Sequence, residues 1–318
     1  MEEHYLRPGV WIDVLARQYL KTYLPQGGSS VKVVVADAND RAQAQDALKR
    51  LANVNNMAYA NVDAAITKTH MIHLLFNAIA AQIDWKHLAN MFMRGALKEH
   101  YGLPGSGSLS VDAIAEANNE SSELVRKELR RIIDQRVFRD YELSREFRFA
   151  ATALCRSVYD PSDDVQQEAE SVCSWLTGRL DRIGALRRIF IYRKIGRNNA
   201  RQILYSTAAW LRSAGMNGLV VTVDISRYAL GRAAEGSGET YTKFAATDMH
   251  EVMRQFVDGT DHLKSTLFVF MTNESFLSDF RLGIRNYEAL RLRLTDEVRD
   301  RNRPNPFAPM VRLRESAT

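Results

Sequence analysis

The feature that most constrains the fold is an alternation of short apolar segments with amphipathic ones, interrupted once by a block without strand patterns. Short, β-branched apolar runs predict strands at 31–36, 57–62, 218–224, 265–272 and 310–313. Apolar residues at helical spacing predict helices at 9–24, from the turn 37–40 to about residue 51, and at 68–82, 84–101, 198–214, 246–258, 275–281 and 285–300. Because strands that alternate with helices form parallel sheets, we predict an α/β protein with a parallel sheet.

The interrupting block predicts a helical insertion in this sheet. Residues 110–180 have helical patterns throughout, and they follow a Gly- and Ser-rich linker at 102–108. We therefore expect three parts: the N-terminal part of the α/β core at 1–101, the helical insertion at 102–178, and the C-terminal part of the core at 179–318.

The composition excludes several classes of protein. Of the 318 residues, 46% are hydrophobic and 25% charged, which excludes general disorder. No apolar run is long enough for a membrane span, and the first residues lack the apolar segment of a secretory signal. Cys155 and Cys173 fit a reducing compartment, so we expect a cytoplasmic protein without a membrane partner. His70 and His73 are three apart on a predicted helix but have no further ligand nearby, so we expect no metal site.

The turn after the first strand stands where a phosphate-binding loop would lie, since ligands bind at the carboxyl ends of parallel strands. Such a loop needs glycines whose amides approach the phosphates, a lysine, and a Ser or Thr for magnesium. The turn at 36–43 has neither glycine nor lysine, and Asp37 and Asp40 add negative charge. We expect it to repel a triphosphate and to serve as an ordinary turn with a helix N-cap.

Two further strands end in polar residues. Asp224 follows an apolar strand, as does the aspartate with which NTPases hold Mg²⁺. The next residue is Ile225, which cannot act as the base that activates water. Asn273 follows the strand at 265–272, at the place of an ATPase sensor residue. Either side chain can instead cap the next turn.

Several segments resemble the ATP-binding proteins of BREX phage-defence systems, which are AAA-like P-loop ATPases. The segments that carry the resemblance are 175–178, 200–215, 218–224, 283–294 and 305–313. The likeness covers 175–313 well and the first 80 residues loosely. It implies a P-loop NTPase-like, AAA-like sheet and a prokaryotic antiphage defence complex whose other proteins are partners.

Departures from that family determine the predicted mechanism. The family has a Gly-Ser-Gly-Lys-Thr type of loop where this chain has residues 39–43, and Asp-Glu where it has Asp224 and Ile225. We therefore predict a pseudo-ATPase without ATP or magnesium as cofactors. The alternative is an active ATPase that completes its site with a partner and binds both. The predicted remnants of a nucleotide site are Ala36, Asn39, Ala42, Gln43, Asp224, Asn273, Arg285 and Arg293. By the resemblance, the two arginines contact a γ-phosphate or reach a neighbouring subunit; otherwise they are surface residues.

Two basic segments are candidates for contact with DNA. Segment 179–201 carries eight basic residues and one acidic residue, and segment 111–133 has a helix–turn–helix pattern with a basic second helix. The candidate residues are Arg126, Lys127, Arg130, Arg131, Arg187, Arg188, Arg193 and Lys194. The same residues can instead form a partner surface or salt bridges. The predicted function is a scaffold or DNA-associated adaptor, with a DNA-binding module as a further alternative and the oligomeric state open.

Overall fold

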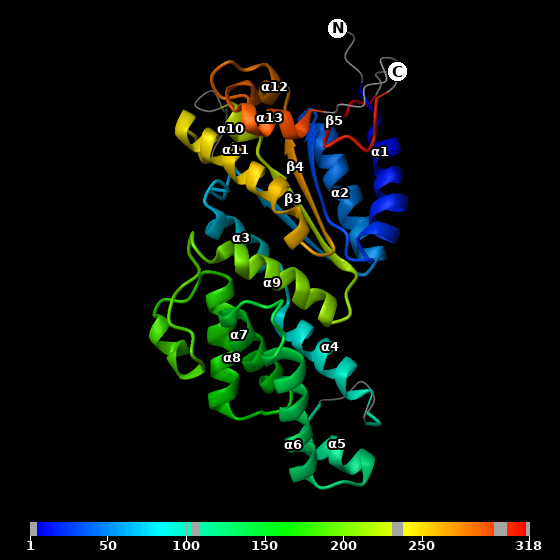
Figure 1. Ribbon diagram of the computed structural model, residues 1–318, viewed down its shortest axis with the longest axis vertical. Coiled ribbons are helices and arrows are strands. Elements are labelled where there is room, and N and C mark those ends of the chain that lie inside the picture. The colour runs from blue at the N-terminus through cyan, green and yellow to red at the C-terminus, as the bar shows by residue number, and fades with distance from the viewer. Residues whose placement is uncertain (1–4, 100, 104–108, 231–237, 296–303, 316–318) are drawn as a thin grey trace. The chain divides into compact units, whose positions relative to one another are not determined.

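A computed structural model describes residues 5–99, 101–103, 109–230, 238–295 and 304–315. The chain divides into two compact units, an α/β unit of residues 1–79 and 217–318 and a helical unit of residues 80–216 (Figure 1). The helical unit is wider than the insertion predicted at 102–178. Helices α4 (Trp85–Leu97) and α9 (Ala200–Ser213) belong to it, because both pack against its α7 (Arg145–Ser157).

The α/β unit is built on one five-stranded sheet in the order β2–β3–β4–β1–β5. The strands are β1 (Ser30–Val35), β2 (Met57–Asp63), β3 (Gly218–Asp224), β4 (Thr266–Thr272) and β5 (Met310–Arg312). All pairings are parallel, which confirms the predicted fold class and all five strands. The strand ends are in register, with Val35 opposite Thr272 and Asp63 opposite Asp224. The polar residues at the carboxyl ends of the strands therefore lie together at one end of the sheet.

The sheet is apolar on both faces because helices cover both. On one face lie α1 (Pro8–Val14), the π-helix η1 (Leu15–Tyr23) and α2 (Ala38–Val54), with α11 (Lys243–Asp258) on the other (Figure 1). Alternate residues of β4 enter the two cores. Leu267, Val269 and Met271 join the core with α1, η1 and α2. Phe268 and Phe270 pack against Phe256 of α11 with tilted rings, whose centroids are 4.5 and 5.9 Å from that of Phe256. Burial on both faces explains the continuous apolar runs.

The remaining elements of the α/β unit are short. They are α3 (Ile72–Ala80), α10 (Ser226–Leu230), η5 (Thr260–His262), α12 (Ser275–Ser278), η6 (Ile284–Asn286) and α13 (Glu288–Leu294). Two of them, α10 and η5, were not predicted. The helix predicted at 275–281 ends at Ser278, and residues 296–300 of the one predicted at 285–300 lie outside the described residues. The helix predicted at 68–82 begins at Ile72, so His70 precedes it and bonds the Tyr228 hydroxyl at 2.9 Å. No group of metal ligands occurs among the described residues.

The helical unit contains no strand in its described part, as predicted for residues 110–180. Besides α4, α7 and α9, it contains α5 (Val111–Asn118), α6 (Ser122–Ile133), the π-helix η2 (Asp134–Phe138), α8 (Asp163–Leu176) and the 3₁₀ helix η3 (Ile183–Ile189). Its core holds an aromatic group in which Trp210 contacts Phe92 and Phe147. Residues 104–108 of the predicted linker lie outside the described part of the chain. Where the chain is described, no helix is both long and apolar enough to cross a membrane.

Candidate functional site

The turn between β1 and α2 is too short to wrap around a phosphate. β1 ends at Val35 and α2 begins at Ala38, so only Ala36 and Asp37 connect them. The Asp37 carboxylate caps the helix and accepts a hydrogen bond from the amide of Asp40 at 2.8 Å. The N-terminus of a helix attracts anions because its first amides lack partners. On α2 a carboxylate of the chain itself occupies this position.

A partly buried ion pair joins this turn to the end of β3. Nε of Arg41 lies 3.1 Å from Oδ2 of Asp224, and its Nη1 donates to the carbonyl oxygen of Ala36 at 2.8 Å. The side chains are 11% and 18% exposed, so solvent screens the pair only in part. Because β4 lies between β1 and β3 in the sheet, the Arg41 side chain bridges two strands that are not neighbours.

Asp224 and Asn273 make further hydrogen bonds at the ends of β3 and β4. Oδ1 of Asp224 accepts from the amide of Ser226 at 2.9 Å, so both carboxylate oxygens have donors. Asn273 accepts from the Ser275 amide at 3.1 Å and donates to the Ser226 carbonyl at 3.4 Å. Ile225, which follows Asp224, is 1% exposed. Ala36, Asp224 and Asn273 are therefore gathered at one edge, linked by backbone caps and by Arg41.

The other predicted remnants of a nucleotide site are engaged elsewhere or point to solvent. Asn39, Ala42 and Gln43 are exposed on α2. Arg285 lies over the ring of Phe280, 5.4 Å from its centroid.

Arg293 lies toward the opposite end of the sheet, away from the carboxyl ends of the strands. It pairs with Asp258, the last residue of α11, and the Nη2–Oδ2 distance is 3.1 Å. Just beyond Asp258, the carbonyl of Thr260 accepts a hydrogen bond from Ser29, which precedes β1. This end of α11 therefore lies near the amino ends of the strands, and the structure does not bring Arg293 to their carboxyl ends.

Arg41 is the site residue that sequence reasoning missed. It is the only basic residue in the turn at 36–43, and a carboxylate at the end of a buried strand needs a compensating cation or hydrogen-bond donors. The need of Asp224 for a cation or donor was therefore the sequence signal that could have identified Arg41. The order of the strands, which brings Arg41 over the tip of β3, was not predicted.

The predicted helix–turn–helix at 111–133 is present in the helical unit. Asn119 turns the chain in the left-handed conformation at φ 54°, and Ser121 caps α6. Arg126, Lys127 and Arg130 are exposed on α6 and make no ion pair or hydrogen bond with any described residue. Arg131 differs, because it pairs with Glu128 through Nε at 2.7 Å. Three of the four candidate cations on α6 are therefore available to a ligand.

The second basic segment has a similar division. Arg187, Arg188 and Lys194 are exposed, and their side chains form no ion pair or hydrogen bond within the described ranges. Arg193 lies 2.9 Å from the Glu146 carboxylate on α7. Three of the four candidate cations of this segment are therefore exposed and unpaired among the described residues.

Comparison with known proteins gives one match. The profile of the family described as BREX system ATP-binding protein BrxC/D matches residues 107–317, about two thirds of the chain. No curated protein and no solved structure matches significantly. The matched region begins after the turn at 36–43, and it includes Asp224 and Asn273. The parallel sheet is consistent with a P-loop NTPase-like fold, and the family places the chain in a phage-defence system. The chain belongs to the BREX system ATP-binding protein family BrxC/D.

Proposed function

We propose that this chain is a catalytically degenerate ATPase-like subunit of a phage-defence complex. It acts as a scaffold or DNA-associated adaptor and does not hydrolyse ATP. The observation that carries the proposal is the Arg41–Asp224 pair, which joins the tips of β1 and β3. In an ATPase of this fold, that edge holds the phosphates and the magnesium ion.

The phosphate side of the site argues against ATP. A phosphate-binding loop places several glycine amides and a lysine around the triphosphate. Two residues without glycine connect β1 to α2, and a carboxylate caps the helix. Asp37 would lie close to the phosphate oxygens, where like charges repel and raise the free energy of binding. The family name describes ATP-binding proteins, but residues 36–41 do not fit that ligand.

The magnesium side of the site points the same way. Both oxygens of Asp224 already accept hydrogen bonds, one of them from a guanidinium. A magnesium ion would have to displace Arg41 and leave that cation without its counterion. Ile225 stands where the resemblance implies a water-activating glutamate. Loss of one such catalytic group typically costs roughly 3 kcal/mol of transition-state stabilisation, and here several are absent together.

The alternative is an ATPase whose site is completed by a partner protein. That mechanism requires the partner to supply the phosphate-binding cations and the base, and to release Asp224 from Arg41. The ion pair favours the degenerate subunit over this alternative.

Titration calorimetry of the purified chain with Mg-ATP tests the proposal. We expect no binding at micromolar nucleotide, both for the wild type and for Asp224→Asn, which removes the charge but keeps the shape. Micromolar affinity in the wild type that Asp224→Asn abolishes would show a working nucleotide site and contradict the proposal.

A further inference from the structure

A row of aromatic rings lies on the surface of the helical unit. Phe138 at the end of η2, Phe149 on α7 and Phe190 after η3 contact one another in series. Their ring centroids are 5.6 Å apart from Phe138 to Phe149 and 5.4 Å apart from Phe149 to Phe190. Phe138 and Phe190 are 41% and 54% exposed, and Tyr192, which follows Phe190 closely in the sequence, is 58% exposed. Soluble proteins rarely expose so many neighbouring large rings without a binding role.

The backbone at Phe190, whose ring ends this row, is strained. Phe190 has a φ of 62°, a left-handed conformation that bulky side chains rarely adopt. Such a conformation is unfavourable and persists where the surrounding structure holds it. Phe190 ends η3 and packs on Phe149. Packing on Phe149 therefore holds an exposed ring at one end of the aromatic row in spite of the strained backbone.

Arginines lie over and between these rings. Arg145 is 5.9 Å from the centroid of Phe149, and Arg148 is 5.9 Å from Phe138 and 5.1 Å from the exposed ring of Tyr141. Further exposed cations flank Phe190 and Tyr192 in the sequence. They are Arg187, Arg188, Arg193 and Lys194. The carboxylates near these rings include Asp140 and the exposed Glu142, Asp134, which pairs with Arg139, and Glu146, which pairs with Arg193. Cations outnumber carboxylates on this surface.

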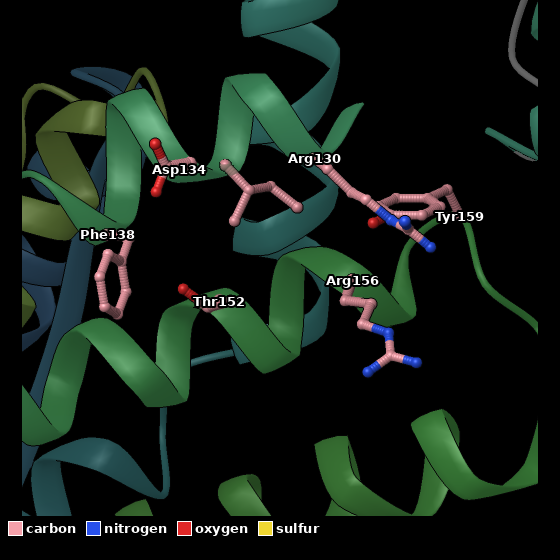
Figure 2. A pocket seen from close by; sticks show the side chains of 7 residues that line it. Arg130, Asp134, Phe138, Thr152, Arg156 and Tyr159 are labelled. Carbon is pink, nitrogen blue, oxygen red and sulfur yellow. The ribbon is translucent and has the colours of Figure 1, made fainter. Parts of the chain in front are cut away.

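A pocket continues the surface beyond Phe138. It has a volume of about 480 Å³ and lies between the α6–η2 helix and α7. Figure 2 shows Phe138 at one end of this pocket and Arg130, Arg156 and Tyr159 toward the other. Arg130 belongs to the exposed cations of α6. The aromatic row therefore leads, by way of Phe138, to a second group of cations.

We propose that this surface binds single-stranded nucleic acid. Exposed rings offer faces on which unpaired bases stack, and the arginines and lysines neutralise the phosphates between them. A duplex offers its phosphates but keeps its base faces stacked internally, so it can contact only the cations of this surface and not its rings. This inference specifies the ligand of the adaptor role under the proposed function, and it does not depend on whether the chain binds ATP.

Fluorescence anisotropy with labelled strands tests this inference. The probes are an oligothymidylate and an oligouridylate of about 20 nucleotides and a duplex of similar length, each titrated at several salt concentrations. The test variants are Phe190→Asn, since asparagine tolerates the left-handed backbone, and Tyr192→Ala. The control is Phe244→Ala on α11, which removes a ring that is 85% exposed in the α/β unit.

We expect each test variant to bind single strands roughly tenfold more weakly, with the salt dependence unchanged and duplex binding unaffected. Phe244→Ala should bind as the wild type does. Alanine at Arg187, Arg188, Arg193 and Lys194 should weaken binding of all probes and reduce the salt slope by about one for each phosphate that is no longer neutralised.

Two results would overturn the inference. One is absence of single-strand binding by the wild type at low salt, which would assign the surface to a protein partner. The other is equal binding of single strands by the wild type and the ring variants, which would show that the cations bind phosphates without base stacking on the rings. The thymidylate and uridylate arms distinguish DNA from RNA. None of these results bears on the calorimetry with Mg-ATP, so the two proposals fail separately.

Discussion

Removal of the Arg41 side chain should destabilise the α/β unit more than removal of an exposed arginine. Arg41→Ala leaves Asp224 without its counterion and the Ala36 carbonyl without a side-chain donor. Breaking a fully buried ion pair by removing one partner costs about 3–5 kcal/mol. Arg41 and Asp224 are 11% and 18% exposed, and Asp224 keeps its bond from Ser226, so we expect roughly 2–3 kcal/mol.

A double-mutant cycle separates the pair from other effects. Asp224→Ala should also be destabilising, and the double variant should cost less than the sum of the two single ones, with a coupling of about 1–2 kcal/mol. The matched control is Arg291→Ala, which removes an arginine from an exposed pair with Glu288 on α13. Such pairs contribute little, so we expect no measurable change there.

The assay is urea denaturation in which unfolding is monitored by hydrogen exchange. The peptides measured come from β1 and β3, because these strands report on the α/β unit alone. If Arg41→Ala and Arg291→Ala reduce the free energy of unfolding equally, the reasoning is refuted. The same holds if the cycle shows no coupling, because Arg41 would then contribute through packing and not through its charge.

Three further changes test the local arguments. Asp37→Ala should cost about 1 kcal/mol of unfolding free energy through loss of the helix cap, and Asp37→Asn much less; equal costs would refute the capping role. Gly218→Ala should cost roughly 2 kcal/mol, since its Cβ would meet the Ser265 carbonyl at 2.1 Å, whereas Gly95→Ala meets nothing and should not destabilise α4. Burial lowers the pKa of His250 to about 4, so the unfolded chain takes up a proton below pH 6.5 before the folded one does. Stability should therefore fall by roughly 3 kcal/mol between pH 6.5 and 4, and denaturation of His250→Leu should lack this component; parallel pH profiles would contradict it.

Much of the fold could be predicted from the sequence because the strands are continuous apolar runs with few alternatives. β4 shows why: helices cover both faces of the sheet, so its odd and even positions are both apolar. The boundaries of the helical unit were harder to predict. α4 and α9 have ordinary amphipathic patterns, and only their packing places them with the helical unit.

The candidate site was predicted in part. The strand tips at Ala36, Asp224 and Asn273 follow from parallel topology alone. The role of Arg41 depends on the strand order, and that of Arg293 on its pairing with Asp258, and neither follows from local spacing. The aromatic row was missed because Phe138, Phe149 and Phe190 lie on three separate elements that only tertiary packing brings together.

ATP turnover by the assembled defence complex tests the central claim most directly. The measurement compares complexes that contain wild-type chain, Asp224→Asn, or the control Arg291→Ala, with all other subunits unchanged. If this chain does not hydrolyse ATP, the three complexes should turn over ATP at the same rate, including a rate of zero. If the Asp224→Asn complex assembles as fully as the wild type, turnover that falls at least tenfold with Asp224→Asn and stays unchanged with Arg291→Ala would contradict the account, because Asp224 would then hold a catalytic magnesium ion.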